Sequence, residues 1–138
     1  MIDKDNGEIT FDNGFILSRK FTRDEIEKLK FGMKSTLIRN SAPWYVVQLD
    51  NIKISGLNFS IVLYFNNNKL IMVDMSISDT KYGTSWDDWT KEKEMDRNRD
   101  NKNWLYQYTN GQNEFPWGKI WAGYDEKVGG SSIHIRYK

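Results

Sequence analysis

The side chains best suited to acid–base chemistry lie near the C-terminus. Polar and apolar residues alternate over 131–137, which predicts a strand with His134 and Arg136 on its wet face. His134 is the only histidine, and an imidazole changes charge near neutral pH, so it can act as a general acid or base. One hypothesis is therefore a small enzyme that uses His134 with Arg136 and a nearby carboxylate. The alternatives are a structural role on the sheet face and contact with a partner. A preceding hairpin strand would place Trp121 or Lys119 beside His134.

Carboxylates are concentrated in residues 86–103. Asp87 and Asp88 are adjacent and point about 100° apart on a helix, so they cannot both face one scissile bond. They are better explained as charges that complement the positive end of a helix. The chain has no cysteine and no second histidine, and Gly129-Gly130 lacks the spacing and lysine of a phosphate loop. We expect no metal site and no cofactor.

Charged residues also interrupt the aromatic stripe of this region. At 100° per residue one stripe holds Trp86, Trp89, Trp104 and Tyr108. Lys93, Arg97 and Asp100 lie on the same stripe between them. Unpaired charges are costly to bury, so they are expected at the sheet edge or beyond it, where a partner can reach them. A basic partner would meet the carboxylates here. The predicted partner-binding residues are Asp87, Asp88, Glu92, Glu94, Asp96, Arg97 and Asp100.

Composition limits the function classes. The 138 residues fit a single domain spanning 1–138, and a net charge of +1 gives no field that favours nucleic acid or anionic membranes. The longest dense apolar run, 61–65, is far too short for a membrane span, and the polar start does not resemble an export signal. Together with the absence of cysteine, this leads us to expect a cytoplasmic protein. The oligomeric state stays open.

Six tryptophans add another alternative. Exposed indole rings can stack on sugar faces, so a carbohydrate-binding module is conceivable if two or three rings are coplanar and exposed.

The elements that must position these groups begin with a hairpin. Strands at 9–11 and 15–17 flank Asp12-Asn13-Gly14. A helix is predicted from Thr22, with Glu25 completing a capping box, a hydrophobic staple of Phe21 and Ile26, and Gly32 available to end it.

The middle of the chain alternates like a half-buried antiparallel sheet. Strands are predicted over 44–49, 52–54, 57–65 and 70–77, with turns at Asp50-Asn51 and Asn66-Asn67-Asn68. A helical region follows from Thr84-Ser85 to Tyr108. Asp and Asn within 96–103 favour a break into two pieces, and one continuous helix is the alternative. The fold class is α+β, with an antiparallel sheet of roughly five or six strands against two helical regions in the order ββ-α-ββββ-α-ββ.

Several segments of residues 84–137 carry a family resemblance. Ser85-Trp86-Asp87-Asp88-Trp89, Trp117-Gly118-Lys119-Ile120, Tyr124-Asp125 and 130–137 resemble small, largely uncharacterised bacterial proteins, some of them immunity proteins that neutralise polymorphic or contact-dependent toxins. The resemblance implies a non-enzymatic protein-binding module that occludes a toxin's active site. It carries over no catalytic motif.

Overall fold

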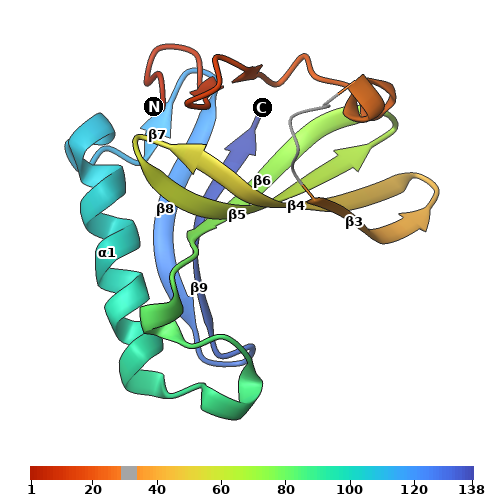
Figure 1. The fold of residues 1–138 in the computed structure, drawn as a ribbon. Helices are drawn as coiled ribbons and strands as arrows, with labels where there is room; N and C mark the ends of the chain where they lie inside the picture. The colour runs from red at the N-terminus through yellow and green to blue at the C-terminus, as the bar shows by residue number, and fades with distance from the viewer. Residues whose placement is uncertain (29–33) are drawn as a thin grey trace.

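A computed structural model describes residues 1–28 and 34–138 of the chain. Its centre is a curved antiparallel sheet with the strand order β3-β4-β5-β6-β9-β8-β7, beside which stands one α-helix (Figure 1). The α+β class and the antiparallel sheet are confirmed, but the sheet has seven strands. The strands are β3 (Lys34–Ser41), β4 (Trp44–Ile54), β5 (Leu57–Asn66), β6 (Lys69–Ile77), β7 (Glu114–Phe115), β8 (Gly118–Asp125) and β9 (Gly130–Tyr137).

Two differences in the sheet have clear physical reasons. The expected turn at Asp50-Asn51 is a β-bulge: Asn51 has φ 59°, the register with β5 shifts between Leu49 and Ile52, and the chain continues as one strand. β3 was not predicted because it is an edge strand. Its side chains from Ser35 onward are exposed, so its sequence carries no alternating burial pattern.

One face of the sheet is the core. Phe59, Ile61, Leu63 and Phe65 of β5 are fully buried, as alternation predicts. The N-terminal segment covers one end of this face, where Trp117 Nε1 donates to the Lys4 carbonyl over 2.8 Å. The helix covers the part formed by β6, β8 and β9 (Figure 1).

The N-terminal segment matches its prediction in part. The hairpin forms as β1 (Ile9–Thr10) and β2 (Ile16–Leu17), in a small separate sheet. The helix expected after Thr22 is instead a 3₁₀ helix, η1 (Arg23–Lys28), and the Thr22 hydroxyl donates to the Glu25 side chain over 3.1 Å rather than capping backbone amides. The predicted stop at Gly32 lies outside the described residues.

The predicted break within 96–103 is wrong. α1 (Lys91–Thr109) is continuous, with Thr90 as N-cap and Asn110 in the left-handed conformation at its end. Asn101 does not compete with the helix backbone, because its side chain accepts a hydrogen bond from Ile77 N over 3.1 Å and donates to Ser76 Oγ over 3.2 Å. The true break lies before the helix, at Trp89.

Two short 3₁₀ turns, η2 (Thr80–Tyr82) and η3 (Trp86–Asp88), precede α1. Trp86 therefore does not share a helical stripe with Trp104, and the expected aromatic stripe does not form. Within the described ranges, no helix is long and apolar enough to span a membrane.

Candidate functional site

The second face of the sheet presents side chains from five strands in two cross-strand rows, and we call it the open face. The pairing register of the strands determines the order of residues within each row. Trp121 of β8 is directly paired with His134 of β9, so the predicted proximity of these two residues is confirmed. The first row is Gln48, Val62, Asp74, His134 and Trp121; the second is Val46, Tyr64, Met72, Arg136 and Lys119.

His134 is held in a chain of three polar side chains on this face. Its Nδ1 lies 2.6 Å from Asp74 Oδ1, and the Tyr64 hydroxyl donates to Asp74 Oδ2 over 3.1 Å. Burial and the Asp74 charge raise the pKa of Tyr64 to about 12, so the hydroxyl stays a donor at neutral pH. The Trp121 ring stacks on the imidazole with centroids 5.2 Å apart. This arrangement fixes the imidazole and directs Nε2 away from Asp74, as a general base requires.

An apolar groove of about 420 Å³ lies farther along the open face, toward β3. Val62, Tyr64 and Met72 on its floor are all partly exposed. Only sheet residues line it, and none of them is His134 or Arg136; they are Ile38, Arg39, Trp44, Val46, Gln48, Val62, Tyr64 and Met72. The predicted catalytic residues thus lie beside the groove and not inside it.

The charges on the open face are unevenly paired. Asp74 is held by His134 and Tyr64, and Asp50 accepts a hydrogen bond from Gln48 over 2.9 Å. Arg136 is exposed and forms no ion pair within the described residues. Arg39, opposite Val46 at the groove, donates to Ser41 Oγ over 2.7 Å and has no carboxylate partner among the described residues. Lys119 of the second row pairs with Glu114 at 3.2 Å. Arg39 and Arg136 are therefore the cations at this face that have no carboxylate partner within the described residues.

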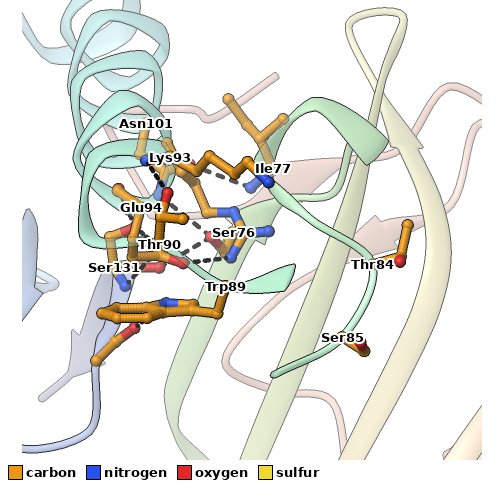
Figure 2. A network of polar contacts seen from close by, with 12 residues as sticks. Ser76, Ile77, Thr84, Ser85, Trp89, Thr90, Lys93, Glu94, Asn101 and Ser131 are labelled. Atoms are coloured by element: carbon orange, nitrogen blue, oxygen red, sulfur yellow. Dashed lines mark hydrogen bonds and ion pairs between the residues drawn. The ribbon is translucent and has the colours of Figure 1, made fainter. Parts of the chain in front are cut away.

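Glu94, one of the predicted partner-binding carboxylates, is a residue of α1 and is only 2% exposed. Its side chain lies between α1 and Ser131 of β9 (Figure 2). One carboxylate oxygen accepts from Arg97 Nη1 over 2.9 Å. The other accepts from Ser131 N over 3.1 Å and from the Ser131 hydroxyl. Arg97 also lies over the Tyr82 ring, with its guanidinium carbon 4.9 Å from the centroid. The Glu94–Ser131 hydrogen bonds connect α1 to β9. Because both oxygens of Glu94 are engaged, this carboxylate is not free to bind a partner.

Other carboxylates of the region are also engaged locally. Asp88 completes a capping box with Ser85, and hydrogen bonds from the backbone N–H groups of Ser85 and Thr84 lower its pKa. Asp100 accepts from the Tyr82 hydroxyl and pairs with Lys81 Nζ at 3.4 Å.

Asp96 pairs with Arg99 at 3.1 Å. Within the described ranges, Asp87 and Glu92 are the predicted carboxylates with no side-chain ion pair or hydrogen bond. The seven predicted residues do not converge on one acidic surface.

Asp74 and Tyr64 were not identified from the sequence. The alternating pattern of residues 70–77 indicates that Asp74 lies on the polar face of its strand. Its pairing with His134, however, depends on β6 lying beside β9. Those strands are far apart in the chain, and local patterns do not specify such adjacency. Within the described ranges, no group of three or more His, Asp or Glu side chains could hold a metal ion.

The chain matches no protein-family model, no curated protein and no solved structure.

Proposed function

We propose that this protein is a non-enzymatic protein-binding module and that its docking site is the open face. The observation that carries the proposal is the apolar groove on an otherwise polar sheet face, formed by strand residues alone. Partly exposed Val62, Tyr64 and Met72 in one patch are unusual for the solvent side of a sheet, and such patches mark interaction sites. Trp44 and Trp121 add the large aromatic side chains that are enriched at binding hot spots.

The unpaired cations indicate the chemistry of the partner. Arg39 and Arg136 have no carboxylate partner within the described residues, whereas Asp74 and the neighbouring Asp50 each accept hydrogen bonds from side chains of the sheet. A partner that combines an apolar contact with surrounding carboxylates complements this surface. A second copy of the same face supplies no free carboxylate, so a different protein fits better. This partner chemistry is the reverse of the basic partner expected from residues 86–103.

An immunity protein that occludes a toxin is the specific form of this proposal. It is supported by the resemblance of residues 84–137 and by a broad, shallow binding face, which suits occlusion of another protein better than enclosure of a small substrate.

The test measures binding to a candidate toxin chosen from the products of the genes that flank this one. Val62→Glu places a carboxylate in the groove and should weaken affinity about 30-fold, the effect of losing about 2 kcal/mol at a hot spot. Met95→Glu is the matched control, because Met95 is an exposed apolar residue of α1 outside the open face. Equal affinities of the two variants would contradict the proposed docking site.

Catalysis is the second candidate, favoured by one observation: Asp74 orients His134 as it would orient a general base. His134→Gln separates the two functions. If the protein acts by binding, the folded variant keeps most of its activity. Loss of activity by orders of magnitude with partner binding unchanged would establish catalysis instead.

A further inference from the structure

A second groove, of about 600 Å³, lies beside the start of α1, between the 83–89 loop and the β8–β9 turn. Its walls include Trp86 and Trp89 on one side and Val128 and Gly129 on the other, and Arg97 contributes to its lining. It is the largest of the grooves described, and the open-face groove shares no residue with it.

Two indole rings form the aromatic part of this groove. Trp86 is 72% exposed, the highest value among the exposed large apolar side chains of the described residues. Its ring centroid lies 5.9 Å from that of the half-buried Trp89, at an interplanar angle of 42°. The rings are not coplanar and Trp89 is half-buried, so the expected platform of two or three coplanar, exposed rings does not form here. Trp86 offers one exposed ring face, which suits a single small ring of a ligand.

Contacts within the chain already hold the two indole rings of the groove in place. Trp89 Nε1 donates to the Gly129 carbonyl over 3.0 Å, which ties the 83–89 loop to the β8–β9 turn. Gly129 has φ 66°, and a Cβ there would lie 3.4 Å from the Trp89 ring and 3.6 Å from the Trp86 ring. Glycine therefore permits the turn, while a Cβ at these distances would make only ordinary contact with the indoles.

The polar lining is mixed and nearly neutral. Arg97 is balanced by buried Glu94, and its Nε is buried with no hydrogen-bond partner among the described residues. Exposed Thr84 and Ser85 also line the groove. The Thr84 hydroxyl donates to Asp88 over 3.2 Å and can still accept, and the Ser85 hydroxyl accepts from Asp87 N over 3.2 Å and can still donate. Phosphate-bearing ligands gain little from a cation that is already neutralised.

We propose that this groove binds a neutral saccharide. A sugar ring presents C–H groups to an aromatic face and hydroxyl groups at its edge, which match the exposed Trp86 ring and the surrounding mixture of Arg97, Ser85 and Thr84. An extended peptide fits less well, because the groove is bordered by loops and turns and offers no unpaired strand edge for its backbone. The open face and this groove are separate sites, so either proposal stands without the other.

The experiment follows the indole N–H signals of the ¹⁵N-labelled full chain during titration with maltose, cellobiose and N,N′-diacetylchitobiose. At least one disaccharide should shift the Trp86 and Trp89 signals with saturable, millimolar affinity. Trp86→Ala should weaken that affinity about 10-fold, the loss expected for one aromatic stacking contact. Trp121→Ala is the matched control, because Trp121 is the other exposed tryptophan and lies on the open face; it should bind the same sugar as the unmodified chain does.

Two results would overturn the inference. One is the absence of any saturable shift at Trp86 with all three disaccharides. The other is a shift that survives in Trp86→Ala or disappears in Trp121→Ala, which would place the sugar elsewhere. If the groove responds only to the protein partner, with Trp86→Ala weakening that complex, the saccharide site is rejected and the groove becomes part of the protein interface.

Discussion

The helical region of residues 86–103 and the open face carry charge in opposite ways. The helical region has eleven charged side chains, but most of them are paired: Glu94 holds Arg97, Asp96 holds Arg99, and Asp100 holds Lys81 of the preceding η2. The open face has few charges, yet Arg39 and Arg136 have no carboxylate partner within the described residues. Unpaired charges, rather than the number of charges, therefore guide the choice of the proposed docking site.

The largest effect expected from this comparison is on stability. Glu94→Ala should lower the free energy of unfolding by about 3 kcal/mol, because it leaves Arg97 without its partner and Ser131 N–H buried and unbonded. Urea unfolding followed by circular dichroism measures the change. Glu92→Ala is the matched control, an exposed carboxylate two positions away whose removal should change stability by less than about 0.5 kcal/mol. Equal stabilities would show that the Glu94 network is not structural.

The second effect is on association. Arg136→Glu should slow binding of an acidic partner to the open face by about 10-fold at low salt and reduce the salt dependence of the rate, since it reverses an unpaired cation. Surface plasmon resonance over a range of ionic strength measures both quantities. Arg99→Glu reverses a cation already paired with Asp96 and should change the rate much less. A larger effect of Arg99→Glu would return the interface to the helical region.

The sequence was informative where burial repeats locally. Alternation identified β5, β6 and β9 and placed His134 and Arg136 together on one face, and the Asp12-Asn13-Gly14 turn located the first hairpin.

The sequence was uninformative where contacts between distant parts of the chain determine the environment of a side chain. From the sequence alone Asn101 is expected to break the helix, but in the structure its side chain is hydrogen-bonded to β6. Glu94 is likewise expected at the surface, but it is buried beside Ser131. The Asp74–His134 pair depends in the same way on the adjacency of β6 and β9.

A third effect appears at alkaline pH. The pKa of Tyr64 is raised to about 12, chiefly by burial and then by Asp74, so the folded chain holds this proton more tightly than the unfolded chain does. The resulting stability is complete below the unfolded pKa of about 10 and is lost as pH rises from there toward 12. Tyr64→Phe should flatten that part of the stability curve relative to the unmodified chain. An unchanged slope between pH 10 and 12 would contradict the raised pKa of Tyr64.

The smallest expected effect is on the stability of the protein at acidic pH, and it concerns Asp88 of the helical region. Backbone hydrogen bonds from Ser85 and Thr84 lower the pKa of Asp88, so its contribution to stability is present above the unfolded value of 3.8 and is lost as pH falls through the lower folded value. Asp88→Asn should reduce stability at neutral pH slightly and make it less dependent on pH below 4. Asp87→Asn is the matched control, because the Asp87 side chain has no hydrogen-bond or ion-pair partner in the described part of the chain. Thermal unfolding from pH 2 to 7 distinguishes the variants. If Asp87→Asn reproduced the effect, general helix-end electrostatics would explain these two acids, and the capping box would not.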